Sequence, residues 1–96
     1  MSGDTDSFCL GQLVYSRAGR DRRRPFLVWR IEPDRIYLVD GKIRRTTKPK
    51  KKNPLHVQPV NRMATDIAAR LMKGETVTDA EVRRAIELLT SGTNEG

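Results

Sequence analysis

The chain has 96 residues and a formal net charge of +7, with 36% hydrophobic and 32% charged residues. This length fits one small domain with a modest core. No apolar run approaches the roughly twenty residues of a membrane-spanning helix, and the first residues lack the basic and apolar regions of a signal peptide. The single cysteine, Cys9, allows no disulfide within the chain. We therefore expect a cytoplasmic protein that does not enter a membrane.

The first part of the chain has the pattern of short β-strands. Residues 1–9 are small, polar and acidic, and we expect a disordered leader with Phe8 as its first anchor. Strands are predicted over residues 10–17, 25–31 and 35–39, and a turn at 32–34 joins the last two. Both alternation phases of residues 25–31 are mostly apolar, so the pattern leaves the inward face of that strand open.

Asp40-Gly41 is the strongest short hairpin signal in the chain and leads into residues 42–46. Residues 48–54 cannot form a central strand, because prolines bracket them and their like charges repel. Residues 55–58 alternate apolar and polar side chains and end at Pro59, which is consistent with a last short strand. Four or five short strands in residues 10–60 predict a small, strongly bent barrel.

The period then changes from two to 3.6, which indicates helices. Apolar residues recur through residues 62–73, and Gly74 is a stop signal. Thr78 and Glu81 form a capping box at the start of a second helix over 79–89. Helices this short must pack on each other, on the barrel or on a partner. The predicted fold class is mainly β with C-terminal α: the barrel, a two-helix hairpin over 61–90, and a disordered tail over 91–96.

Positive charge is concentrated in the strand-rich part of the chain. Residues 11–59 contain fourteen basic residues against four acidic ones. A compact module with a lopsided positive field suits a partner made of phosphates, and RNA is the leading interpretation. The candidate RNA-binding residues form two groups: Arg17, Arg20, Arg22, Arg23 and Arg24, then Lys42, Arg44, Arg45, Lys48, Lys50, Lys51 and Lys52.

The two groups differ in chemistry. The arginine group offers planar forks that grip phosphate and stack on bases, whereas the lysine-rich group positions a protein on the backbone. Solvated loops that maintain solubility are the alternative for both groups, and a sorting signal is a further alternative for the second. The aromatics Tyr15, Phe26, Trp29 and Tyr37 are candidates for stacking on unpaired bases. In so small a core they are more often packing residues, and Trp29 is assigned to the core.

Residues suited to catalysis or metal binding are scarce. Cys9 and His56 are the only residues of their types and cannot form a zinc site or a catalytic triad. Asp34 and Asp40 are interpreted as turn formers rather than as paired carboxylates. We expect no enzyme activity, no metal and no cofactor.

Several of these segments together resemble the bacterial KOW-domain RNA-binding proteins, which are similar to ribosomal protein L14e. The matching segments are residues 11–14, 18–22, 26–28, 39–45, 48–50, 55–59 and 78–85. The resemblance implies an SH3-like barrel whose basic loops bind RNA in a translation context, without catalysis. Two positions depart from the family pattern. Arg23 stands where members tend to carry glycine, which makes that turn less permissive, and Pro25 stands where an aromatic is expected.

The partner expected from these observations is structured ribosomal RNA on or near the ribosome. The helices over 62–73 and 79–89 are candidates for contact with a ribosomal protein, and the chain is expected to be a monomer off the ribosome. The alternative function is an SH3-like protein-interaction module of the translation or transcription machinery. Double-stranded DNA is disfavoured because no predicted recognition helix carries the charge.

Overall fold

The structure is a computed structural model that describes residues 7–17, 19 and 22–91. The predicted leader up to residue 6, Arg20 and the tail from residue 92 lie outside the described residues. Five strands precede two helices, and their bounds are β1 Gln12–Ser16, β2 Pro25–Glu32, β3 Arg35–Val39, β4 Lys50–Lys52, β5 Val57–Met63, α1 Thr65–Met72 and α2 Asp79–Ser91.

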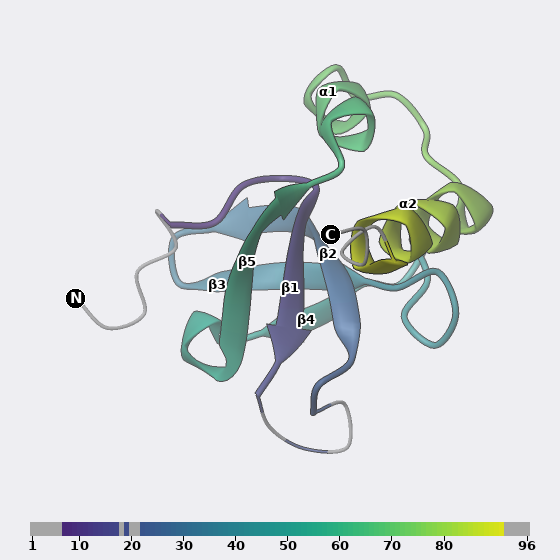
Figure 1. Cartoon of the computed structure of the whole chain (residues 1–96). Coiled ribbons are helices and arrows are strands. Elements are labelled where there is room, and N and C mark those ends of the chain that lie inside the picture. Colours follow the sequence, from purple (N-terminus) through teal and green to yellow (C-terminus); the bar gives the residue numbers. More distant parts are fainter. Residues whose placement is uncertain (1–6, 18, 20–21, 92–96) are drawn as a thin grey trace.

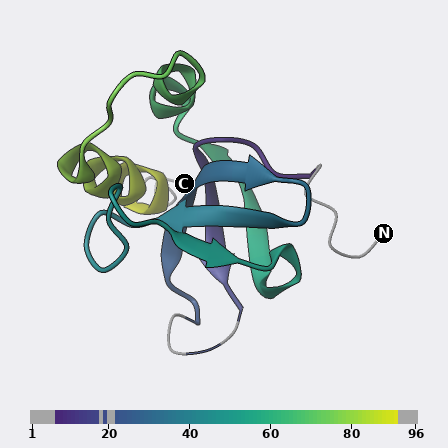
Figure 2. The ribbon, with the colours of Figure 1, turned by 180° about the vertical axis from the view of Figure 1, so that it is seen from behind.

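The strands form one antiparallel sheet in the order β4-β3-β2-β1-β5 (Figures 1 and 2). The predicted turn after β2 is confirmed, because Glu32 pairs with Arg35 across a two-residue loop. The last strand, β5, returns to pair with β1, so the chain folds back on its own start. A strand-rich, barrel-like sheet followed by two helices agrees with the predicted fold class.

Both faces of β2 are covered over residues 26–29, which explains why both alternation phases are apolar there. Phe26 and Val28 face a cluster inside the curved sheet that also contains Phe8. Leu27 faces a second cluster on the opposite side of the sheet, with Trp29 packed against it. This second cluster includes side chains from both helices, so the helices cover one side of β2 while the curved sheet encloses the other.

The predicted hairpin into residues 42–46 is wrong. The chain turns at Asp40-Gly41 but forms no strand there, and β3 pairs instead with β4, at Lys50–Lys52. Asp40 Oδ1 accepts the amides of Lys42 at 2.9 Å and Arg44 at 2.8 Å. The side chain thereby holds two donors that a returning strand needs for its ladder. As expected, the proline-bracketed lysines avoid a central position, because β4 is an edge strand.

The boundaries of the barrel also need correction. Residues 54–56 form a short 3₁₀ helix rather than the start of a strand, because Asn53 Oδ1 accepts the amide of Leu55 at 2.9 Å. The strand β5 continues through Pro59 to Met63, which an edge position permits. Residues 62–63 therefore belong to the sheet and not to the first helix. At the other end, Phe8 is buried in the core, so the predicted leader is too long.

The start of α2 agrees with the sequence. The Glu81 carboxylate accepts the Thr78 amide at 2.9 Å, and the Glu81 amide donates to Thr78 Oγ1 at 3.2 Å, which confirms the capping box. Arg70 of α1 joins the two helices by donating to Glu81 Oε2 at 2.7 Å. Neither described helix has the length and apolar character needed to cross a bilayer.

Candidate nucleic-acid interface

The segment between β3 and β4, residues 40–49, has a well-defined conformation although it is a loop. Asp40 is only 6% exposed, and its carboxylate holds the two backbone amides described above. Backbone hydrogen bonds from Asp40 and Gly41 to the Arg44 carbonyl, at 2.9 and 3.1 Å, close the turn. The only acidic residue of this segment therefore acts as its internal support.

The first turn of α2 holds the same loop from outside. Asp79 Oδ1 accepts the Thr46 amide at 2.8 Å, and Arg83 Nη1 donates to the Gly41 carbonyl at 2.7 Å. Gly41 has a φ of +75°, and a Cβ at this position would lie 2.5 Å from the Asp79 carbonyl oxygen. Glycine is therefore required at residue 41 both for its backbone conformation and for the close approach of α2.

The cations of the second basic group other than Lys42 line two adjoining hollows. The larger, of about 630 Å³, contains residues 43–45 and 47–51, and the smaller, of about 170 Å³, contains Asp34, Arg35 and residues 51–53. Lys51 lines both hollows. Within the described parts of the chain, several of the cations take part in no ion pair: Lys42, Arg45, Lys48, Lys50, Lys51 and Lys52. We call residues 42–52 the basic loop-strand.

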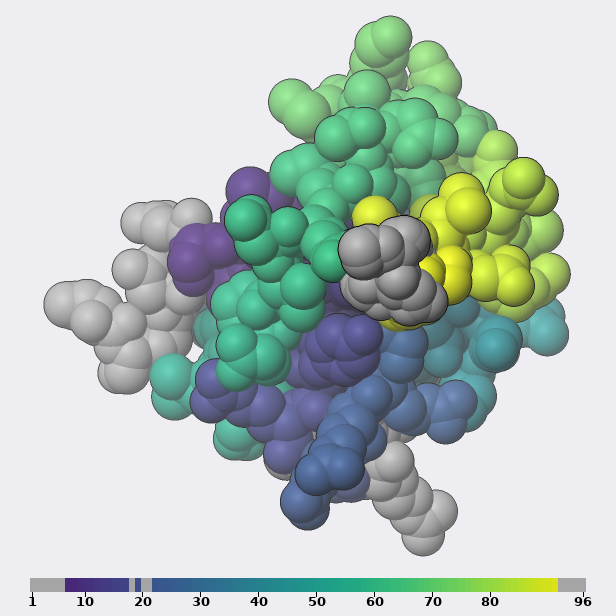
Figure 3. Space-filling view, in the orientation of Figure 1, coloured from purple at the N-terminus to yellow at the C-terminus, as the bar shows by residue number. Residues whose placement is uncertain are grey.

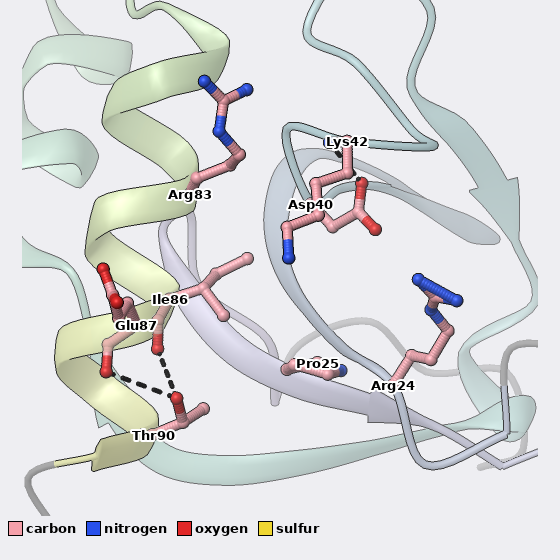
Figure 4. Close-up of a pocket in the computed structure, with 8 residues that line it drawn as sticks. All are labelled: Arg24, Pro25, Asp40, Lys42, Arg83, Ile86, Glu87 and Thr90. Carbon is pink, nitrogen blue, oxygen red and sulfur yellow. Dashed lines mark hydrogen bonds between the residues drawn. The ribbon is translucent and has the colours of Figure 1, made fainter.

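One residue of the first basic group adjoins the basic loop-strand. Arg24 and Lys42 line the same pocket, of about 470 Å³, between the sheet and α2. Figure 4 shows Arg24, Asp40 and Lys42 on one side of this pocket and the side chains of α2, Arg83 among them, on the other. Arg24 of the first group and Lys42 of the second thus line one pocket. Glu87 also lines the pocket, and its negative charge partly offsets the positive charge there.

The other described arginines of the first group lie elsewhere. Arg17 donates to the Gln58 side-chain oxygen of β5, and its amide donates to the His56 carbonyl at 2.8 Å. Arg22 and Arg23 are exposed, and their segment projects at the lower edge of the molecule (Figure 3). Arg20 lies outside the described residues, so its prediction stays open. The structure therefore places Arg24, but not Arg17, beside the second group.

Arg23 has an unusual backbone. Among the described residues it is the one non-glycine residue with a positive φ, which is 69°. Its amide donates to the Ser16 carbonyl at 2.8 Å, and the Ser16 amide donates to the Arg24 carbonyl at 3.3 Å, so β1 and the start of β2 hold it there. This is the position at which the family that the sequence resembles tends to carry glycine. The backbone at residue 23 is left-handed although the residue is an arginine.

The aromatic candidates separate by burial. Phe26 is buried in the inner cluster, and Trp29 is partly buried against the second cluster, as expected for core residues. Tyr15 and Tyr37 keep part of their surface accessible. Only the latter lies on a strand beside the basic loop-strand, because Tyr37 pairs with Lys51.

Two basic residues at these hollows were not among the candidates from sequence. Arg35 lines the smaller hollow and ion-pairs with Asp34 at 3.3 Å. Arg83 reaches the Gly41 carbonyl across 42 residues of sequence. A basic residue beside a predicted turn could have indicated Arg35, whereas no local pattern indicates the contact of Arg83.

The strongest change in pKa lies away from the basic surface. The Arg70 guanidinium, together with the Thr78 amide, lowers the pKa of Glu81 to about 2. The same hydrogen bond raises the pKa of Arg70. This ion pair fixes the start of α2, from which Asp79 and Arg83 reach the basic loop-strand.

In the described part of the chain, no group of three or more His, Cys, Asp or Glu side chains is placed to hold a metal ion. No protein-family model matches the chain, and no curated protein matches it in a sequence comparison. What the protein does must therefore be inferred from the site itself.

Proposed function

We propose that this chain is a non-catalytic RNA-binding protein that contacts structured ribosomal RNA through the basic loop-strand and Arg24. The observation on which the proposal depends is the fixed shape of residues 40–49. Asp40 supports this loop from within, and Asp79 and Arg83 hold it from α2. A loop whose backbone is already held loses little backbone entropy when its cations bind phosphates, which favours a binding role over a solvated loop.

Protection of a sheet edge explains only part of the charge. Lysines on an edge strand discourage pairing with other chains, and Lys50–Lys52 lie on such an edge. Lys42, Arg45 and Lys48 lie outside the strand, however, and gain nothing from edge protection. Concentrating these charges also destabilises the folded state through their repulsion. Contact with a polyanion explains the positive charge both in the loop and on the edge strand β4.

The fold that we propose is an SH3-like barrel of the KOW type. In its favour are the five antiparallel strands, the return of β5 to β1 and the 3₁₀ turn before β5. Together with the resemblance in sequence, this leads us to propose a cytoplasmic protein of the translation apparatus that is monomeric off the ribosome. RNA is favoured over DNA because the exposed cations are concentrated in a loop and an edge strand rather than along a helix.

The test replaces Lys50, Lys51 and Lys52 together with glutamate and measures binding to ribosomal RNA fragments by filter retention. A matched control replaces Arg62, Lys73 and Arg84 with glutamate, which changes the net charge equally at exposed residues elsewhere. If six cations neutralise single-stranded phosphates, log Kd changes with log salt with a slope of about 4, so fourfold more salt weakens binding by roughly two to three decades. We expect the first variant to lose binding and the control to retain most of it. Equal binding by both variants would contradict the proposal.

The alternative, a protein-interaction module, has one observation in its favour. Met72 at the end of α1 is 76% exposed and Leu88 of α2 is 61% exposed. Large exposed apolar side chains are suited to docking on another protein. That function predicts partner binding that depends weakly on salt and survives the triple substitution to glutamate. Co-sedimentation of both variants with ribosomes, at low and high salt, separates the two functions.

A further inference from the structure

Three side chains form a row across the outer face of the sheet, on strands that Figure 2 shows side by side in front of β1 and β5. Arg30 of β2 pairs with Tyr37 of β3, and Tyr37 pairs with Lys51 of β4. Directly paired residues lie on the same face of a sheet. The neighbours of Tyr37 along its strand, Ile36 and Leu38, are buried in the inner cluster, so this row points outward.

The guanidinium of Arg30 lies over the ring of Tyr37. Its central carbon lies 5.6 Å from the centre of the Tyr37 ring, within cation–π range. Glu32 contacts both residues, because Arg30 Nη2 lies 3.1 Å from Glu32 Oε2 and the Tyr37 hydroxyl donates to Glu32 Oε1 at 3.5 Å. The Arg30 side chain nevertheless stays 68% exposed. It is therefore oriented by two neighbours and still accessible.

The charge of Arg30 does not explain this arrangement. Glu32 compensates the positive charge at 3.1 Å, so the pair adds little to the field that attracts phosphates. What remains available is the planar surface of the guanidinium, on which nucleic-acid bases stack. The row ends at Lys51, which lines both cationic hollows. A base placed on Arg30 would thus belong to a strand whose phosphates reach the basic loop-strand.

We propose that an unpaired RNA base stacks on the exposed face of the Arg30 guanidinium, with Tyr37 supporting the opposite face. This inference rests on the proposed RNA-binding function and specifies its ligand as RNA with a bulged or single-stranded nucleotide. The other aromatics are less suitable: Phe26 is buried and Trp29 packs under the helices. Tyr15 pairs with Pro25 and Gln58 rather than with a basic strand.

The test compares two RNA hairpins of the same stem, one with a single bulged 2-aminopurine and one fully paired. Arg30→Lys keeps the charge and removes the plane, and Arg84→Lys is the matched control on the exposed surface of α2. We expect Arg30→Lys to weaken binding to the bulged hairpin by roughly tenfold, as for the loss of one stacked base, and to leave the paired hairpin unchanged. The fluorescence change of the bulged base on binding should be lost as well.

A second pair of variants guards against loss of folding. Tyr37→Phe keeps the supporting ring and should bind the bulged hairpin almost as the parent does, whereas Tyr37→Leu should lose the preference for the bulge. Thermal melts confirm that each variant is folded. If Arg30→Lys keeps the full preference for the bulged hairpin, the stacking site is wrong. If, in addition, the variant with Lys50, Lys51 and Lys52 replaced by glutamate no longer binds either hairpin, the proposed RNA-binding function is still supported. If the parent protein binds neither hairpin at low salt, both proposals are wrong.

Discussion

Replacing Arg23 with glycine should stabilise the protein, and it tests whether this segment, which lies away from the basic loop-strand, also contacts RNA. The φ of 69° at Arg23 lies in the left-handed region, which glycine adopts without a steric penalty and other residues do not. Arg22, immediately before it, does not have a positive φ. Glycine at residue 22 therefore removes the same charge from the same segment without relieving any strain. The two substitutions form a matched pair.

The expected changes in the free energy of unfolding follow from two effects, the strain of the left-handed backbone and the flexibility of glycine in the unfolded chain. Left-handed geometry costs a non-glycine residue about 1–2 kcal/mol. Glycine costs about 0.5–1 kcal/mol through the greater freedom of the unfolded chain. Arg23→Gly should therefore raise the free energy of unfolding by about 0.5–1 kcal/mol, and Arg22→Gly should lower it by a similar amount. For a domain of this size, 1 kcal/mol corresponds to a shift in Tm of roughly 4–8 °C.

The assays separate stability from binding. Thermal unfolding followed by circular dichroism gives the sign of each change in Tm, and filter retention over a series of salt concentrations gives the number of phosphate contacts. If residues 22 and 23 both meet phosphates, each glycine variant should reduce the salt slope by about 0.7–0.9. Arg23→Lys should leave both quantities close to those of the parent. Shifts in Tm of the same sign for the two glycine variants would refute the argument from backbone strain.

Two further predictions concern α2. Gly41→Ala should lower the free energy of unfolding by about 2–4 kcal/mol, because backbone strain adds to the clash with Asp79. Gly74 has a φ of +76° but no atom within 4 Å of its Cβ, so Gly74→Ala should cost only about 0.5–1 kcal/mol in urea unfolding. Equal costs would contradict the close packing of α2 on residue 41. The pKa of Glu81 is lowered from 4.5 to about 2, so its stabilising contribution is present above pH 4.5 and lost as the pH falls towards 2. Glu81→Gln should therefore flatten the dependence of Tm on pH in this window, and an unchanged profile would argue against the pair with Arg70.

Besides packing on the sheet, α2 holds the loop between β3 and β4 in place. Asp79 and Arg83 hold the backbone of the loop that contains the exposed cations. The capping box at Thr78 and the ion pair from Arg70 to Glu81 fix the residues that make these contacts. In the proposed function, α2 thus supports the RNA-binding surface from behind, and its loss should lower affinity even if it touches no RNA.

The sequence by itself determined the features that depend on local chemistry. Proline and aspartate after β2 specify its tight turn, the spacing of Thr78 and Glu81 specifies the start of α2, and the concentration of basic residues can be counted directly. Only the tertiary structure decided which residues pair with β3, because the Asp40 carboxylate competes with the ladder for the amides of Lys42 and Arg44. It also decided which basic residues share a pocket. Arg24 and Lys42 line the same pocket, and Arg83 reaches the Gly41 carbonyl, through contacts between segments distant in sequence, for which no local pattern exists.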